Sequence, residues 1–159
     1  MNNCTKRLLA IEQLTNTLVS YVPMLTNKKT SVSAWSVGEQ LHHTLLVNES
    51  ILTKIMANES VEGKPTTLIG RIILFLGVIP RGKGKAPKIF VTKQLTEKEV
   101  NTLITQQLTT IAILKNIDNT TLQCSFPHPY FGLLTTKQWL RFIQIHTNHH
   151  VKIIRDIMS

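Results

Sequence analysis

The residues of this chain whose type and spacing most clearly predict chemistry are two histidines near the C-terminus, His146 and His150. They continue an apolar stripe at helical spacing, which comprises Trp139, Phe142, Ile143, Ile153, Ile154 and Ile157. Side chains four residues apart on a helix are neighbours, so two neutral imidazoles placed in this way can bind one divalent ion together. Spacing alone leaves hydrogen-bonded core histidines as the alternative interpretation, and His149 lies off the stripe.

A third metal ligand has to come from another part of the chain. His42 and His43 are the candidates in a second helical segment, and His128 is an alternative in a loop. The apolar arc of that segment is wide, with His43 near one edge beside Val47 and His42 near the other edge beside Met56. Periodicity therefore does not decide which histidine faces the pair.

The elements that must position these histidines are helices. Hydrophobic periodicity predicts helices over 4–24, 36–58, 67–79, 96–116 and 136–157, and no segment shows convincing strand alternation. Three starts fit a capping box: Ser36 with Glu39, Thr96 with Glu99, and Thr135 with Gln138. Pro23 and the proline- and glycine-containing segments 58–65, 80–87 and 127–132 interrupt the periodic segments. The sequence thus predicts an all-α protein, a four-helix bundle with a short additional helix.

Length and composition favour one globular domain over 1–159, since the chain has 159 residues, 42% of them hydrophobic and 17% charged. The longest apolar stretch, 68–80, is shorter than the roughly 20 residues needed to cross a bilayer, so we expect no membrane partner. The N-terminus lacks the pattern of a secretion signal, and Cys4 and Cys124 are isolated. A cytoplasmic protein with reduced thiols is the expectation.

The formal net charge of +9 raises the question of a nucleic-acid partner. The one concentration of basic residues is a segment with almost no aromatic residues to stack on bases: Arg81, Lys83, Lys85, Lys88 and Lys93. Gly82-Lys83-Gly84 lacks the rest of a phosphate-binding fingerprint. We therefore expect a solvated basic loop and no nucleic acid.

Two motifs resemble the DinB/YfiT-like superfamily of metal-dependent enzymes. The segment WSVGEQLHH (35–43) is similar to the family pattern W-S-x-x-E-x-L-x-H, whose ligand histidine matches His43. The run HPYFGLLT (128–135), followed by Trp139 and then HTNHH (146–150), resembles an uncharacterised DinB-like branch with an HP-aromatic-FG pattern, a Trp and HxxHH. The motifs occur in the expected order and together cover most of the chain.

The resemblance implies a four-helix bundle in which one histidine of the second helix and two of the last bind nickel, zinc or another divalent ion. Carried over onto this sequence, the ligands are His43, His146 and His150. The resemblance also implies a small-molecule substrate, in some members a low-molecular-weight thiol, and a homodimer. Many relatives have Gln three residues after the last ligand, where this chain has Ile153, so the catalytic residues stay unassigned.

The function expected from these features is a metal-dependent hydrolase or thiol transferase, because three ligands leave a coordination position open for water or a thiolate. Glu39 is expected to serve the helix cap and Glu49 to be solvated, so neither predicts a general base. His128 and Tyr130 are expected to form a turn and a lid on the bundle end. The alternatives are a non-catalytic metal- or ligand-binding bundle and a basic protein that contacts nucleic acid.

Overall fold

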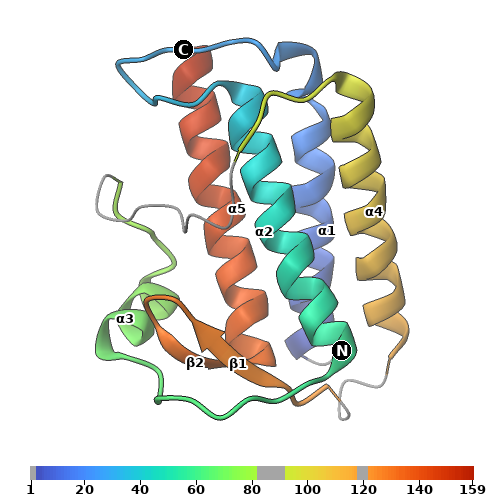
Figure 1. The fold of residues 1–159 in the computed structure, drawn as a ribbon, viewed down its shortest axis with the longest axis vertical. Coiled ribbons are helices and arrows are strands. Elements are labelled where there is room, and N and C mark those ends of the chain that lie inside the picture. Colours follow the sequence, from blue (N-terminus) through green and yellow to red (C-terminus); the bar gives the residue numbers. More distant parts are fainter. Residues whose placement is uncertain (1–2, 82–91, 118–121) are drawn as a thin grey trace.

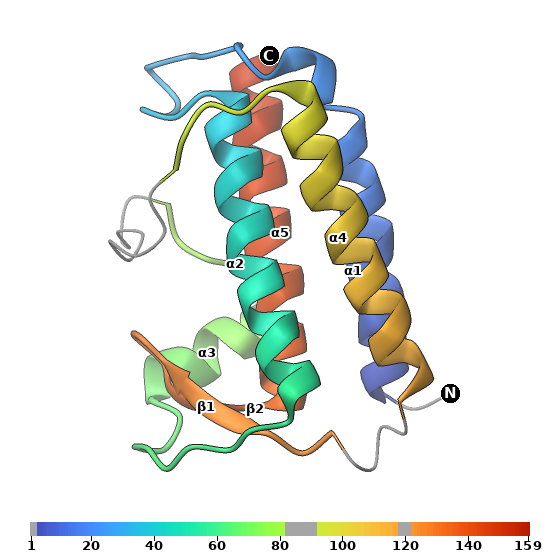
Figure 2. The same ribbon diagram turned by 45° about the vertical axis from the view of Figure 1, so that its right-hand side comes forward.

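Four long helices lie side by side in the computed structural model, which describes residues 3–81, 92–117 and 122–159 (Figures 1 and 2). They are α1 (Asn3–Val19), α2 (Val37–Ala57), α4 (Glu97–Asn116) and α5 (Thr136–Met158). Each packs against two others, α1 and α2 both contacting α4 and α5. A short α3 (Leu68–Leu76) and a two-stranded hairpin lie at one end, and the 3-10 turn η1 (Val22–Met24) at the other. The prediction of an all-α bundle with an additional helix is confirmed.

The helix starts follow from the predicted capping boxes. Ser36 Oγ accepts the backbone N–H of Glu39 at 3.2 Å, and Glu39 Oε2 accepts the backbone N–H of Ser36 at 2.7 Å. The same reciprocal bonds begin α4 at Thr96 and α5 at Thr135. These bonds satisfy backbone donors that have no partner within the helix, and they explain why the predicted starts agree with the structure within one residue.

Two predicted helix ends lie too far along the chain. The first helix ends at Val19, not at residue 24, because Pro23 has no N–H to continue an α-helix and lies in η1. The helix predicted to reach residue 79 ends at Leu76, because Gly77 adopts a left-handed conformation with φ 72°. Pro23 and Gly77 both mark helix ends, but hydrophobic periodicity alone does not show at which residue each helix stops.

The hairpin was not predicted, since we expected segment 127–132 to be a loop between helices. Strands β1 (Ser125–His128) and β2 (Gly132–Thr135) pair in antiparallel fashion, with Phe126 opposite Leu134. Gly132 has φ 72°, and a Cβ there would overlap the carbonyl oxygen of Pro65, so this turn requires glycine. Strands of four residues are too short to show alternation in the sequence.

The core consists of two hydrophobic clusters stacked along the bundle. One contains Leu8, Leu52, Ile111 and Leu140 near the hairpin, and the other contains Leu18, Leu41, Val100 and Ile154 near the opposite end. Polar side chains from each of the four long helices lie between the clusters: Thr15, Thr44, Asn48, Gln107 and Thr147, each at most 1% exposed. The histidines of interest belong to this level of the bundle. No helix among the described residues is long and apolar enough to cross a membrane.

Candidate metal centre

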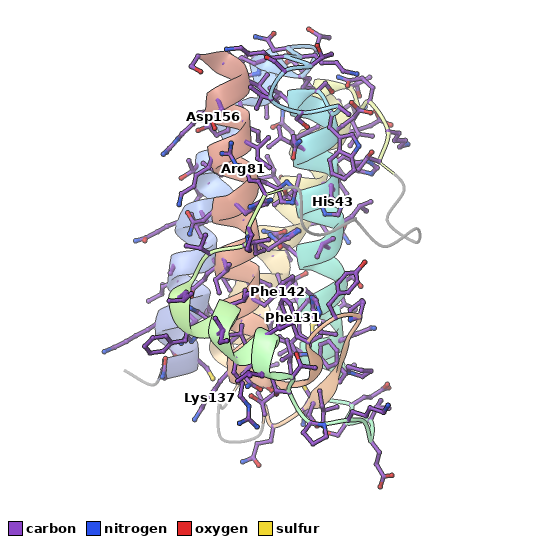
Figure 3. The ribbon with its side chains drawn as sticks, turned by 90° about the vertical axis from the view of Figure 1, so that its left-hand side faces the viewer. His43, Arg81, Phe131, Lys137, Phe142 and Asp156 are labelled. Carbon is purple, nitrogen blue, oxygen red and sulfur yellow. The ribbon has the colours of Figure 1, made fainter. Side chains whose placement is uncertain are left out.

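Three buried imidazoles converge between α2 and α5. His43 comes from α2, and His146 and His150 come from neighbouring turns of α5. His146 Nε2 lies 3.2 Å from His43 Nε2 and 3.1 Å from His150 Nε2. One nitrogen from each ring lies within 4.8 Å of the others, and the residues are only 4–7% exposed. Figure 3 shows His43 partway along the bundle, between Phe142 and Asp156.

The spacing of the three nitrogens fits a single first-row metal ion. Two ligand nitrogens at about 2.0–2.1 Å from a tetrahedral ion lie ~3.3 Å apart. The two closest separations in the cluster, 3.1 and 3.2 Å, are near that value. All three donors are imidazole nitrogens, which suit zinc, nickel, copper and iron. The residues present are therefore able to hold a divalent ion.

Burial keeps these imidazoles in the neutral form that binds metals. Desolvation, followed by the neighbouring His42 and His149, lowers the pKa of His43 to about 4. Desolvation also lowers the pKa of His146 and of His150 well below the usual value, with the other histidines adding to the effect. Near neutral pH a ring nitrogen with a free lone pair is thus present in each residue.

A hydrogen-bond chain orients one of the three rings. His150 Nδ1 lies 2.6 Å from Gln40 Oε1, and Gln40 Nε2 donates to Ser33 Oγ at 2.9 Å. With the amide in this orientation, Nδ1 of His150 carries the proton and Nε2 has the lone pair. Sequence reasoning missed Gln40 and Ser33. The available signal was that Gln40 precedes His43 by three residues and so lies on the same helix face.

Aromatic rings surround the cluster. The part-buried Trp35 lies 5.1 Å from His43 between ring centroids and stacks on His150 at 6.5 Å. Phe142 stacks on His146 at 5.4 Å. Trp139 is a core residue, as expected, since its indole N–H donates to the Phe126 carbonyl beneath the hairpin. Trp35 forms part of the wall around the three histidines.

The remaining histidines serve other contacts. His42 Nδ1 accepts the backbone N–H of Lys93 at 2.9 Å, which ties α2 to the segment before α4. His149 hydrogen-bonds to the backbone of Ile79, and burial lowers its pKa. His128 Nδ1 accepts the N–H groups of Tyr130 and Phe131, so this ring builds the hairpin turn, as its turn interpretation predicted. The structure brings His43, and neither His42 nor His128, to the α5 pair.

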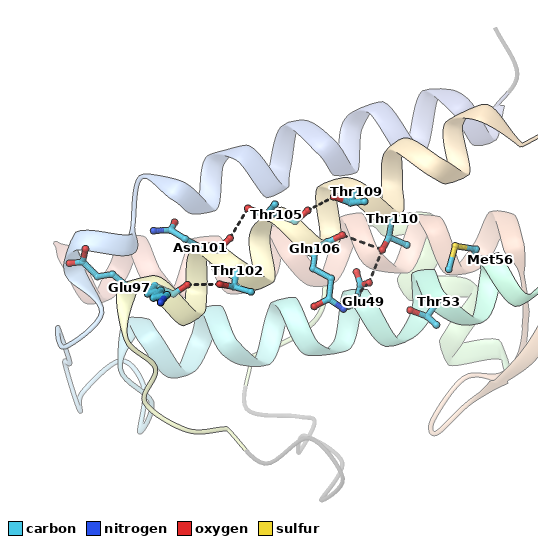
Figure 4. A pocket seen from close by; sticks show the side chains of 11 residues that line it. Glu49, Thr53, Met56, Glu97, Asn101, Thr102, Thr105, Gln106, Thr109 and Thr110 are labelled. Atoms are coloured by element: carbon cyan, nitrogen blue, oxygen red, sulfur yellow. Dashed lines mark hydrogen bonds between the residues drawn. The ribbon is translucent and has the colours of Figure 1, made fainter.

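The glutamates near His43 in sequence have structural partners. Glu39 belongs to the cap of α2, as predicted. Glu49, expected to be solvated, is half-buried, and its Oε1 accepts the Thr110 hydroxyl at 2.7 Å (Figure 4). Neither His42 nor His43 lines the groove around it, which lies between α2 and α4. Asn148 lines a separate hollow beside Arg141, between α1 and α5, and not the histidine cluster.

The basic segment is only partly within the described residues. Lys83, Lys85 and Lys88 lie outside them. Arg81 pairs with Asp156 at 2.6 Å (Figure 3), and Lys93 lies 3.8 Å from Glu99. The two described cations therefore have carboxylate partners from this chain. Both cysteines are buried and form no disulfide, and burial raises the pKa of Cys124.

Comparisons with known proteins agree with this geometry. The model of the DinB superfamily matches residues 6–154. An uncharacterised protein of Bacillus subtilis, YuaE, is 28% identical over 137 residues, which are 82% of each chain. No solved structure matches the chain.

Proposed function

The chain belongs to the DinB superfamily, and from this membership and the converging imidazoles we propose that His43, His146 and His150 bind one divalent metal ion. The observation that carries the proposal is the convergence of three neutral, buried imidazoles. The Nε2 atom of His146 lies 3.2 Å from that of His43 and 3.1 Å from that of His150. An ion between the three rings would bind the lone pairs of these nitrogens and so favour their close approach in the core. Zinc and nickel are the ions we propose.

His43, His146 and His150 would hold a divalent ion with at least one coordination position open, where the ion would supply Lewis-acid activation. The protein contributes the rest of the site. Gln40 holds His150 by its Nδ1, and the rings of Trp35 and Phe142 border the imidazoles and limit the access of water. We assign no residue to proton transfer.

For the activity, we propose a metal-dependent hydrolase or thiol transferase that acts on a small molecule, with a low-molecular-weight thiol as a candidate substrate. Ester and amide hydrolysis should be compared with thiol consumption from an electrophilic acceptor, using protein loaded with zinc or nickel. Turnover that needs the metal and disappears in His146→Ala supports the enzyme. Metal binding without any turnover in either assay favours the non-catalytic metal-binding bundle.

We also propose that the chain forms a homodimer through the outer face of α3. Apart from Arg71, the side chains of this helix are apolar. Six large side chains there and just beyond it are 46–86% exposed: Leu68, Ile69, Ile72, Phe75, Leu76 and Val78. A patch of this kind covers several hundred square ångströms, and a standard interface covers about 800 Å² per partner. A second copy that presents the same face would bury it symmetrically.

Two further expectations remain proposals. We propose that residues 1–159 act as one domain, because the same four helices line both hydrophobic clusters. We propose a cytoplasmic location, because Cys4 and Cys124 form no disulfide, which is typical of proteins in reducing compartments.

A further inference from the structure

The side chain of Gln40 connects a candidate metal ligand to the loop before α2. It is 1% exposed, and its two polar atoms have different partners: Oε1 contacts His150 Nδ1 at 2.6 Å and Nε2 contacts Ser33 Oγ at 2.9 Å. Ser33 Oγ also accepts the backbone N–H of Trp35 at 3.1 Å. The indole of Trp35 stacks on His150. The loop therefore reaches His150 both through hydrogen bonds and through a ring contact.

A histidine binds a metal through Nε2 only when that nitrogen has a lone pair, and the partner of Nδ1 decides whether it does. An acceptor at Nδ1 holds the proton there, which leaves Nε2 free. A donor at Nδ1 would place the proton on Nε2 and block the metal. Since the two atoms of an amide differ in this respect, the orientation of the Gln40 side chain decides the tautomer of His150.

We propose that Gln40 is a positioning residue that holds His150 in the metal-binding tautomer, and that Ser33 supports this contact by accepting the Gln40 N–H. This inference rests on the proposed metal site. It assigns a role to two residues outside the three ligands. In the observed orientation Ser33 Oγ accepts the Gln40 N–H, whereas in the flipped amide Ser33 would donate its hydroxyl to Oε1 and Gln40 would present a donor to His150.

The first test does not require metal. Long-range proton–nitrogen NMR correlations of the metal-free protein identify the tautomer of each histidine. We expect His150 to be protonated at Nδ1 in the wild-type protein and to lose this preference in Gln40→Leu. A wild-type His150 protonated at Nε2 would mean that the amide is flipped and would overturn the inference.

The second test measures zinc affinity by competition with a chromophoric chelator. Gln40→Leu should weaken binding roughly 10- to 100-fold, the usual effect of losing a partner of a ligand histidine. Gln40→Glu keeps an acceptor that cannot flip to a donor while ionised, so it should restore affinity to at least the wild-type level. Ser33→Ala should give a smaller loss than Gln40→Leu.

Gln107→Leu is the matched control, because Gln107 is equally buried in the polar layer but contacts Thr15 on α1. It should leave zinc affinity within about twofold, even if it destabilises the fold. Equal losses in Gln40→Leu and Gln107→Leu, or no rescue by Gln40→Glu, would reduce Gln40 to a structural residue. Absence of zinc binding in the wild-type protein would instead refute the metal site itself.

Discussion

His42 and His43 are consecutive residues of α2, yet their imidazoles contact different parts of the protein. His43 Nε2 faces His146 Nε2 at 3.2 Å, whereas His42 Nδ1 accepts the backbone N–H of Lys93 at 2.9 Å. Consecutive helix residues are about 100° apart, and here both directions are buried because α5 covers one and the segment before α4 covers the other. One of the pair is therefore available to a metal and the other anchors a connection.

His42→Ala should destabilise the protein without affecting metal binding. The substitution removes the acceptor of the Lys93 N–H and a buried ring, which should lower the free energy of unfolding by about 1–3 kcal/mol. Urea denaturation at neutral pH measures this loss. A variant as stable as the wild-type protein would show that the bond to Lys93 contributes little.

His128 should make stability depend on pH. Burial lowers its pKa to about 4 in the folded state, against ~6.5 in the unfolded chain. Below pH ~6.5 the unfolded state therefore binds a proton that the folded state excludes, so this contribution to stability is lost as pH falls from ~6.5 towards 4. The free energy of unfolding, measured at several pH values across this window, should fall with pH.

Two substitutions separate the roles of His128. Asn at this position can accept the N–H groups of Tyr130 and Phe131 but does not titrate, so His128→Asn should reduce the pH dependence. It should not abolish it, because the pKa of the buried His43, His146 and His150 is lowered as well. His128→Ala removes the acceptor as well and should be less stable than His128→Asn at neutral pH, by about 1–2 kcal/mol. An unchanged pH slope in both variants would exclude His128 as its source.

The exposed face of α3 should control the oligomeric state. Phe75 is 86% exposed, so Phe75→Ser should leave the fold intact while it weakens a dimer at least tenfold, as expected for a central aromatic residue. Sedimentation equilibrium measures the dissociation constant. Ile113→Ser, on the outer face of α4 and 46% exposed, is the control and should have no effect. A wild-type chain that stays monomeric at high concentration would remove the proposed interface.

Much of the fold could be predicted because its signals are local. Capping boxes at Ser36, Thr96 and Thr135 fix where three helices begin, and the amphipathic stripe of α5 identifies its buried face. The hairpin could not be predicted, because its stability comes from long-range contacts, such as Pro65 against Gly132 and Trp139 beneath Phe126. The end of α1 was missed because the apolar pattern continues through η1.

The candidate site, like the fold, has one part that local sequence signals predict and another that depends on long-range contacts. Helical spacing placed His146 and His150 on one face, but it could not choose between His42 and His43, since both are buried. That choice depends on which helix covers each ring, and only the resemblance supplied it. The roles of Gln40 and Ser33 were missed. The residues that hydrogen-bond to a ligand histidine, directly or through another residue, depend here on the conformation of the loop before α2, which hydrophobic periodicity does not predict.

Metal content is the most direct test of the three-histidine centre. Protein prepared without a histidine tag is loaded with zinc, dialysed and assayed by elemental analysis, together with five single alanine variants. We expect about one ion per chain in the wild-type protein, His42→Ala and His149→Ala, and little or none in His43→Ala, His146→Ala and His150→Ala. A folded wild-type chain without stoichiometric metal, or undiminished metal in His146→Ala, would contradict the account.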